Sequence, residues 1–521
     1  MLLVDLPNVS NVKSLRLILG DQLNPDHSWY QRCDSSVLYC LMEIRAESEY
    51  VKHHIQKISG LFAAMRSFSQ VLKSKGHRVA YIKISDPTNR HNFLENLQLL
   101  CQKYSVETFA YQLPDEYRLD ILFKSIASTL DIPTKVYDTE HFLTKRDELK
   151  TFFEGKKTYL MESFYRAQRK KYQVLMDGKQ PISGKWNYDL ENRKKLTNME
   201  LIPKPKFPQN DLTKVYQEVI EADLPFIGKI NPRQFIWPIN TEQAEEIYDA
   251  FLETQLPLFG TYQDTMVQEN WTLFHSRISF ALNTKMLQPI HVVRKAEEHW
   301  KQNEEKISIA QVEGFIRQIL GWREYMRGVY WAQMPSYANK NYFYHTRPLP
   351  NYFWTGDTKM NCISTTVKQS LDHAYAHHIQ RLMVTGNFLL MAGINPDEVD
   401  VWYLGIYIDA FEWVEITNTR GMSQYADGGI VATKPYVSSA SYLHKMGDYC
   451  SNCFYEKNRK TGERACPFNS LYWHFLHENQ NKLQGNPRMG MMYRVWNKFS
   501  LENQESILSQ ARIYLEQLEH L

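Results

Sequence analysis

Short apolar runs alternate with amphipathic stretches along the first 140 residues of the chain. The apolar runs have the length and composition of strands and cover residues 15–20, 37–44, 78–84, 108–113 and 134–138. The stretches between them carry apolar residues at helical spacing and cover residues 50–74, 91–104 and 115–129. This alternation is typical of a parallel sheet with helical crossovers. We therefore expect an α/β N-terminal domain with a Rossmann-like parallel sheet.

The pattern changes twice after this domain. From about residue 155 to 230 it decays into segments rich in Lys, Arg, Pro and Asn, which indicate a long connection that wraps a surface. Its basic runs predict either a solvated face or phosphate contacts. Beyond residue 230 strand signals nearly vanish, and helical periodicity covers residues 241–256, 291–305, 310–331, 366–393 and 505–521. We expect an α/β domain over residues 1–140, an interdomain linker over 141–230 and a large all-α domain over 231–521.

Composition narrows the class of protein. With 521 residues, of which 43% are hydrophobic, the chain can bury the cores of two or three domains. No run of about 18 apolar residues is present, so we expect no membrane span. The seven cysteines are an odd number and no secretory signal opens the chain, which favours a reducing, cytoplasmic compartment without disulfides. A net charge of +3 neither demands nor excludes nucleic acid.

Four cysteines in the C-terminal half form a candidate metal site. A CxxC pair is followed thirteen residues later by a third cysteine and preceded 88 residues upstream by a fourth, which gives the set Cys362, Cys450, Cys453 and Cys466. Four thiolates can hold either zinc or a 4Fe-4S cluster. One CxxC unit with two isolated cysteines, and a proline directly after Cys466, favour the cluster modestly. A turn without metal, and His474 as a substitute ligand, stay open as alternatives.

Two segments of the helical half could bind an anionic ligand. In "HSRISFALN", Ser276 and Ser279 stand near a predicted helix start, where hydroxyl and backbone N–H groups can donate to a phosphate, although serines there are usually caps. In "FIRQILGWREYMRGVYW", Arg323 lies among aromatic residues with Gln318 about one turn before it. Such an arginine either pairs with a phosphate or carboxylate, or is a snorkelling cation on a core helix.

The segment "LDHAYAHHIQRLMVTGNF" contains three histidines. His373 and His377 are four residues apart and are expected on one helical face, but the glutamate of a helical zinc-protease motif is absent. A histidine pair in a pocket, such as His377 with His378, can transfer protons because the pKa of histidine lies near neutral.

Carboxylates and aromatic residues are mixed in residues 400–429. Asp409, Glu412 and Glu415 could flank a polar ring and accept hydrogen bonds from its amide or ammonium groups. The neighbouring Trp402 belongs to a set of aromatic side chains that could stack on such a ring or carry electrons. The segment therefore predicts one wall of a binding pocket.

Several motifs together resemble the photolyase/cryptochrome superfamily, and specifically its bacterial branch of (6-4) photolyases with an iron–sulfur cluster. The motifs are "LILGDQLNPDHSW" followed by "EIRAESEYVKHHIQKI", then "HSRISFALN", "HHIQRLM" and the four cysteines with their spacing. The resemblance runs over essentially the whole chain. It implies an α/β antenna domain joined by a long linker to a helical domain that holds U-shaped FAD, which is the organisation that the periodicity predicts.

The resemblance also implies roles for residues around the flavin. The FAD-binding set would be Ser276, Ser279, Gln318, Arg323, Arg381, Asp409 and Glu415. Arg381 would pair with Asp409 beside the isoalloxazine ring, and the phosphates would lie near the two serines. Glu415 stands where other branches often have an asparagine that faces flavin N5, so the chemistry at N5 would differ. The four cysteines would hold the 4Fe-4S cluster.

The antenna in this branch is 6,7-dimethyl-8-ribityllumazine. Its implied positions in this sequence are Asp21, Gln22, Glu47 and Tyr50. The ends of the strands in an open α/β sheet would supply the crevice. Methenyltetrahydrofolate or a deazaflavin are the alternative antennae.

The implied reaction is light-driven repair of ultraviolet-damaged DNA by a monomer. Energy passes from the antenna to reduced FAD, and an electron goes to a (6-4) photoproduct that is flipped out of the duplex. His377 and His378 would move the proton that returns the hydroxyl group, and Tyr436 would contact the lesion. The relay that photoreduces the flavin would be Trp402, Tyr403 and Trp354.

Two other functions stay open from the sequence. A cryptochrome-like photoreceptor would bind the same flavin and signal through partners without repair, although signalling alone requires no lesion acid. A primase-like or structural cluster protein would use only the C-terminal cysteines. Lesion preference between (6-4) products and cyclobutane dimers is also open.

Overall fold

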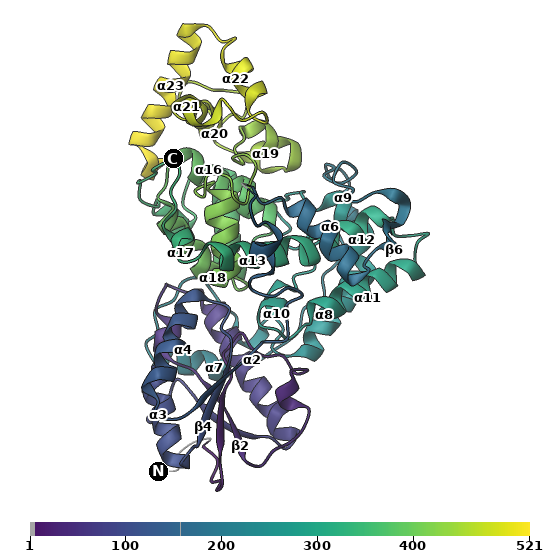
Figure 1. Ribbon diagram of the computed structural model, residues 1–521. Helices are drawn as coiled ribbons and strands as arrows, with labels where there is room; N and C mark the ends of the chain where they lie inside the picture. Colours follow the sequence, from purple (N-terminus) through teal and green to yellow (C-terminus); the bar gives the residue numbers. More distant parts are fainter. Residues whose placement is uncertain (1–5, 157) are drawn as a thin grey trace.

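The computed structural model describes residues 6–156 and 158–521, and its N-terminal part contains a five-stranded parallel sheet (Figure 1). The strands pair in the order β3-β2-β1-β4-β5. Their bounds are β1 Ser14–Leu17, β2 Val37–Met42, β3 Arg78–Ile82, β4 Thr108–Gln112 and β5 Thr134–Tyr137. Each strand ends one to three residues earlier than the sequence predicts, and all five predicted strands are present.

Helices cover both faces of this sheet. α2 (Ile55–Ser74) packs on one face, and α3 (Phe93–Tyr104) and α4 (Tyr117–Thr129) pack on the other. The apolar core on the α2 side continues into the helical half, where Trp237 is buried in the same cluster as Ile58. The predicted fold class, a parallel α/β domain followed by a large helical part, is confirmed.

The segment between the two halves carries more regular structure than its sequence pattern indicates. α6 (Met161–Tyr172) and α7 (Thr213–Glu221) lie within it. Tyr165 is fully buried, and its hydroxyl group donates to Glu313 at 3.0 Å. Arg169, from a basic run predicted to be solvated or to contact phosphate, is instead fully buried and donates to three backbone carbonyl groups. The backbone satisfies its charge, which composition alone does not indicate.

The remainder of the chain is mainly helical (Figure 1). Its helices of eight or more residues are α8 Thr241–Thr254, α11 Pro289–Gln302, α12 Ile309–Ile316, α13 Glu324–Gln333, α15 Asn361–His373, α17 Pro396–Ile406, α20 Pro467–Glu478 and α23 Leu501–Glu516. Among the described residues, none of the helices has both the length and the apolar character to cross a bilayer.

One predicted helix is interrupted at a functionally important place. The pattern over residues 366–393 predicts a continuous helix, but α15 ends at His373 and Ala374 adopts a left-handed conformation with φ of 53°. The Ala374 N–H group closes the last turn by donating to the Ser370 carbonyl group at 2.8 Å. His373 and His377 therefore do not share a helical face, and that prediction is wrong.

Candidate active site and second cavity

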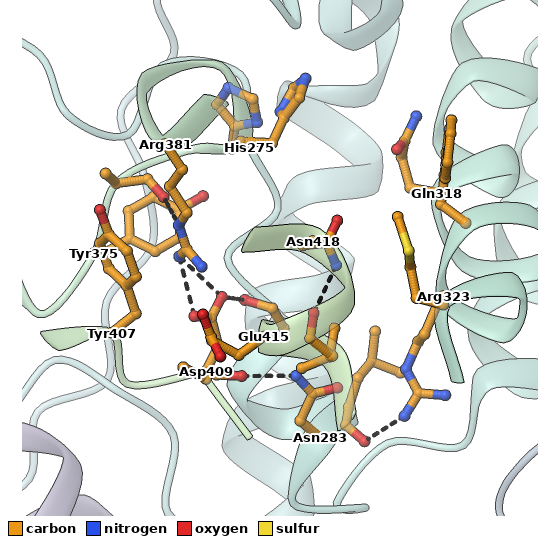
Figure 2. Close-up of a pocket in the computed structure, with 18 of the residues that line it drawn as sticks. His275, Asn283, Gln318, Arg323, Tyr375, Arg381, Tyr407, Asp409, Glu415 and Asn418 are labelled. Carbon is orange, nitrogen blue, oxygen red and sulfur yellow. Dashed lines mark hydrogen bonds and ion pairs between the residues drawn. The ribbon is translucent and has the colours of Figure 1, made fainter. Parts of the chain in front are cut away.

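A cavity of about 350 Å³ opens in the helical half. Three π-helical turns border it, together with the short helix α10; these elements are Arg317–Arg323, Gln380–Gly386, Thr417–Ser423 and Ser279–Asn283. Such π-helical turns occur frequently at functional sites. Figure 2 shows side chains from several of these elements converging on the cavity. Its size lies in the range of small-molecule and cofactor pockets.

An ion pair between Arg381 and Asp409 forms one wall of the large cavity (Figure 2). Arg381 Nη2 lies 3.0 Å from Asp409 Oδ1 and donates to Oδ2 at 3.2 Å. The guanidinium group also lies 3.8 Å from the centre of the Tyr407 ring. Burial acts to lower the pKa of Arg381, but the Asp409 carboxylate together with the Tyr407 and Tyr375 hydroxyl groups outweighs burial, and the pKa is raised. The pair is therefore a fixed charged feature that a ligand would meet on binding.

Arg323 brings a second, less completely paired cation to the cavity. Its Nη2 atom lies 3.0 Å from His141 Nε2 and donates to the Leu282 carbonyl group at 3.2 Å. Its Nε and Nη1 atoms have no hydrogen-bond partner within residues 6–156 and 158–521. Burial lowers the pKa of Arg323 to about 10, although Glu324 acts in the opposite direction. A buried guanidinium group with spare donors suits a phosphate or carboxylate of a ligand.

Glu415 is a buried carboxyl group that lines the cavity near Asp409 (Figure 2). Burial, reinforced by the charge of Asp400, raises the pKa of Glu415 well above its ordinary value. Its Oε1 atom has no hydrogen-bond partner in the part of the chain that the structure describes. A carboxyl group that stays protonated near neutral pH can donate a hydrogen bond, for example to a ring nitrogen.

The two serines predicted to bind phosphate have different surroundings. Ser279 is the first residue of α10, and its hydroxyl group donates to Asp409 Oδ2 at 2.6 Å, so it stabilises the ion pair. Ser276 lines the cavity, as does Gln318, whose Nε2 atom donates to the Gly314 carbonyl group at 3.1 Å. The residue that precedes α10 is Ile278, which provides no side-chain cap, so the alternative role of these serines as caps is wrong.

Three histidines cluster where the cavity meets solvent. The rings of His275 and His377 stack with centres 4.5 Å apart, and His378 lies edge-on to His275 at 5.6 Å. His378 is exposed, with Nε2 at 3.4 Å from Asp264 Oδ1. His377 is buried, and neither of its ring nitrogens has a hydrogen-bond partner among the described residues. Burial, with the neighbouring positive groups, lowers the pKa of His275 and of His377 well below the ordinary value.

Sequence reasoning missed His275, although it begins the "HSRISFALN" segment. His373, which the sequence pairs with His377, instead stacks on Trp271 with ring centres 4.4 Å apart. No periodic signal connects His275 to His377, because the two belong to different segments that only the fold brings together. The available signal was the position of His275 directly before Ser276, in a segment that we interpreted only through its serines.

Tyr436 lies close to the same mouth. Its side chain is half-buried, and burial raises the pKa of its hydroxyl group. The charges of Arg193, Arg488, Asp189 and Asp264 all act on it, and Asp264 is also the neighbour of His378. The structure thus places this predicted lesion contact on the histidine side of the cavity.

The predicted electron relay starts at the cavity wall. Tyr403 lines the cavity, and its hydroxyl group donates to the Arg381 carbonyl group at 2.7 Å. The Tyr403 and Trp402 rings have centres 5.3 Å apart. Trp402 Nε1 donates to the carbonyl group of Phe353, which precedes the half-buried Trp354. Tyr403 and Trp402 are therefore in ring contact at the cavity wall, and Phe353, whose ring centre lies 5.4 Å from that of Trp402, precedes Trp354 in the chain.

The four cysteines come together although 88 residues separate the first two. Burial raises the pKa of the Cys362 thiol well above its ordinary value, and the neighbouring Cys466, Cys453 and Cys450 raise it further. This mutual influence shows that the four thiols lie close together in the fold, where either zinc or a cluster could use them as ligands.

A second, narrower cavity of about 90 Å³ lies at the carboxyl ends of β1 and β2. Of the predicted antenna residues, Asp21, Glu47 and Tyr50 line it. Arg118 also lines it and donates to both carboxylate oxygens of Glu47, at 2.8 and 2.7 Å. The Arg118 guanidinium group lies 3.9 Å from the centre of the Tyr50 ring. The crevice has the location expected for a ligand of an open α/β sheet.

Two residues of this second cavity differ from the sequence expectation. Gln22 does not line it: its side-chain amide accepts from the Leu19 N–H group at 3.1 Å and donates to the Gln112 carbonyl group at 3.2 Å. Lys57, which sequence reasoning missed, lines it and donates to the Leu404 and Ala410 carbonyl groups at 2.8 and 2.6 Å. Lys57 therefore ties α2 to the loop that carries Asp409.

Comparison with known proteins shows which family the chain belongs to. A family model described as "Deoxyribodipyrimidine photo-lyase-related protein" matches residues 16–235. Over 513 residues the chain is 39% identical to the (6-4) photolyase of Agrobacterium fabrum (strain C58 / ATCC 33970). The aligned region covers 98% of this chain and 100% of that protein. The chain belongs to the (6-4) photolyase family.

Two solved structures share the photolyase/cryptochrome fold with this chain. A class III photolyase from Agrobacterium tumefaciens matches 82% of each chain with a TM-score of 0.56 and 15% identity. A cryptochrome from Synechocystis sp. PCC6803 matches 96% of this chain and 95% of its own, with a TM-score of 0.56 and 12% identity. At these identities the two structures show a common fold, and function must be argued from the sites.

Proposed function

We propose that this protein is a light-dependent enzyme that binds FAD and reverts (6-4) pyrimidine–pyrimidone photoproducts in DNA. The observation that carries the proposal is the full-length likeness, 39% identity over 98% of the chain, to a protein named (6-4) photolyase. Because unrelated functions can share a fold, the residues around the large cavity must also suit this chemistry.

The large cavity has a donor set that suits a flavin dinucleotide. Arg323 would hold a phosphate, since two of its nitrogen atoms lack hydrogen bonds within the described chain, and Ser276 and Gln318 would add polar contacts. Arg381 and Asp409 would present their ion pair to the polar edge of the ring system. Bound FAD would supply the group that absorbs blue light and donates an electron. Ser279 would bind the cofactor only indirectly, by orienting Asp409.

Glu415 is the residue that would distinguish this flavin site. Burial raises its pKa, and in its protonated form it would donate a hydrogen bond to a ring nitrogen of the flavin. An asparagine, the residue often found there in related branches, donates without needing a titratable proton, so the hydrogen bond from Glu415 would depend on pH where that of an asparagine does not.

The histidine cluster would handle the proton of the repair reaction. A lesion must leave the base stack to reach a buried cofactor, and the cavity mouth beside His378 is where it would sit. His378 is exposed, so its Nε2 atom would donate a proton to the oxygen that returns to its original base. His377, kept neutral by burial, would orient His378 through the edge-on contact of their rings, whose centres lie 6.1 Å apart, and Tyr436 would contact the lesion.

The cysteine set would hold a 4Fe-4S cluster. Its supports are the sequence pattern, in which one CxxC unit stands with two isolated cysteines and a proline follows Cys466, and the proximity of the four thiols. Cys362 belongs to α15, and Cys466 immediately precedes α20. The cluster would therefore tie the C-terminal helices to the helix that leads into the histidine segment. We propose this structural role for the cluster before a role in electron transfer.

The second cavity would hold the antenna. Its polar residues suit a heteroaromatic ring, but at about 90 Å³ it is smaller than pockets that enclose a small molecule, which start at about 300 Å³. A lumazine would therefore need its lining side chains to move apart. Trp402, Tyr403 and Trp354 would form the relay that keeps the flavin reduced.

Repair of defined lesions tests this function. Purified protein is illuminated with blue light in the presence of an oligonucleotide that carries one (6-4) product or one cyclobutane dimer. We expect the protein to convert the (6-4) product back to normal bases and to leave the cyclobutane dimer unchanged. This repair should occur only under illumination. His378→Ala should abolish repair and retain flavin, whereas His291→Ala, an exposed histidine on α11, should behave like the parent protein.

The outcomes separate the competing functions. Flavin absorption without repair of either lesion would favour a photoreceptor. Repair of the cyclobutane dimer instead would refute the lesion assignment. Absence of flavin absorption from the purified protein would overturn both light-driven functions.

A further inference from the structure

Leu190 is the most exposed large apolar residue among those the structure describes, with 101% of its reference surface in water. It occupies the tip of a tight turn that is closed by a hydrogen bond from the Glu191 N–H group to the Tyr188 carbonyl group at 2.9 Å. Such positions usually carry Gly, Asn, Asp or Ser. An exposed leucine needs no explanation on its own, so its surroundings decide whether it has a role.

The residues on both sides of Leu190 are anchored. Tyr188 is 5% exposed, and its N–H group donates to Glu313 Oε2 at 3.3 Å. Asn192 is also 5% exposed, and its Nδ2 atom donates to the Ala310 carbonyl group at 3.4 Å. Because the chain is held two residues before and two residues after the tip, Leu190 cannot withdraw into an apolar core by a small local movement.

Ion pairs connect this turn to the cavity mouth. Asp189 lies 3.3 Å from Arg193, Arg193 lies 3.5 Å from Asp264, and Asp264 lies 3.4 Å from His378. Asp189 also pairs with Arg317, which directly precedes the cavity residue Gln318. Ion pairs therefore link the turn to His378, which lines the cavity through which the proposed lesion would enter, and to the segment that carries Gln318.

Positive charge follows the turn along the chain. Arg193, Lys194 and Lys195 are consecutive and exposed. Lysine and arginine side chains at such a rim can contact phosphates, which position a duplex without selecting its sequence. The residues directly beside the tip are acidic, but Asp189 is paired with Arg193 and Arg317, and Glu191 with Lys185 at 3.1 Å. Lys194 and Lys195 can then meet the DNA backbone while the tip meets the bases.

We propose that Leu190 is a wedge that enters the gap left in the duplex when the lesion turns into the cavity. Extrusion of a damaged base leaves a space between apolar base faces, and apolar side chains of other DNA-binding proteins insert between base steps. Burial of the Leu190 side chain against those faces stabilises the extruded state. This inference rests on the proposed function, and it assigns Leu190 to DNA distortion and not to the chemistry at the lesion.

The test compares duplex and single-stranded substrates in the dark. Affinity is measured for one strand carrying a (6-4) product, alone and paired with its complement. We expect Leu190→Ala to weaken duplex binding by about tenfold, the loss expected when a buried leucine is truncated, with single-strand binding unchanged. Leu190→Met, which keeps the volume, should restore most of the duplex affinity.

A second readout and a matched control isolate the wedge from general effects. 2-Aminopurine placed opposite the lesion should fluoresce more strongly with the parent protein than with Leu190→Ala, because the wedge unstacks it. Leu501→Ala removes another exposed leucine, at 83% exposure and at the start of α23, and should change neither quantity.

Each outcome has one meaning. An equal loss on single and double strands, or no loss on the duplex, would overturn the wedge while leaving the proposed repair function intact. If the parent protein itself fails to prefer lesion-bearing over undamaged DNA, the proposed function fails, and the wedge fails with it.

Discussion

The two cavities differ in how far their arginines are paired. In the narrow cavity of the sheet domain, Arg118 is held by Glu47 through two hydrogen bonds and by Glu116 at 2.6 Å, and its Nε atom has no hydrogen-bond partner in the described structure. In the large cavity, Arg323 has a longer carboxylate contact, 3.5 Å to Glu324, and both its Nε and Nη1 atoms lack hydrogen-bond partners in the described structure. Folded proteins rarely leave buried polar groups unpaired. Both cavities therefore offer polar atoms to a ligand, and the arginine of the large cavity is the less completely paired of the two.

This difference predicts how the stability of each site responds to amino-acid substitution. Loss of Arg381 from the large cavity leaves the Asp409 carboxylate, whose side chain is only 9% exposed, with the Ser279 hydroxyl group as its remaining hydrogen-bond donor. In the narrow cavity the Arg118 and Glu47 side chains are 31% and 27% exposed, so solvent screens the loss. Substitutions at the first site should affect stability and cofactor together, and those at the second should affect the antenna alone.

The largest expected effect comes from breaking the Arg381–Asp409 pair. Arg381→Met leaves the Asp409 carboxylate without its cation and should lower the free energy of unfolding by about 3–5 kcal/mol. Flavin should be lost at the same time. Thermal denaturation and the ratio of flavin to protein absorbance measure the two effects. A variant of unchanged stability that retains its flavin would contradict the contrast between the cavities.

The next prediction distinguishes binding of the FAD phosphates from binding of the flavin ring. Arg323→Gln should weaken FAD binding by about tenfold to a hundredfold, since charge-assisted hydrogen bonds contribute roughly 1.5–3 kcal/mol. Riboflavin, which has no phosphate, should bind the variant and the parent protein equally well. Titration of the apoprotein followed by fluorescence measures both affinities. An equal loss for the two ligands would place Arg323 at the ring and not at the phosphates.

Acid should destabilise the histidine side of the large cavity. His275 and His377 are buried with pKa values well below the ordinary value, so their contribution to stability is present above about pH 6.5 and is lost as pH falls. Between pH 6.5 and 5 each should contribute a loss of up to about 2 kcal/mol. His275→Gln should reduce this dependence in denaturant unfolding at several pH values. His291→Gln, an exposed control, should not change it.

The smallest effect is expected in the narrow cavity. Glu47→Gln should lower the free energy of unfolding by only about 1 kcal/mol, because the Arg118–Glu47 pair that it removes is partly exposed and Arg118 keeps Glu116 as a partner. Absorption by the antenna should fall while the flavin content stays at the level of the parent protein. Loss of flavin in this variant would show that the two cavities are coupled, for which Lys57 provides a direct connection.

Local sequence patterns were enough for the sheet domain. All five strands and the three long helices of the sheet domain were predicted, because apolar runs and helical spacing directly express which faces are buried. The grouping of the four cysteines, and of Arg381 with Asp409, came from the resemblance to a family, and the structure brings both groups together. Spacing alone left zinc and a cluster open.

Other features depended on the tertiary structure. Four features were not expressed in local patterns: the end of α15 at His373, the stacking of His275 on His377, the burial of Arg169, and the hydrogen bond from Gln22 to the Gln112 carbonyl group. Local periodicity describes which side of an element faces the core, and it contains no information on which segment lies opposite. The amino-acid sequence by itself determined the layers and the chemical groups available, and three-dimensional packing decided which of these groups share a cavity.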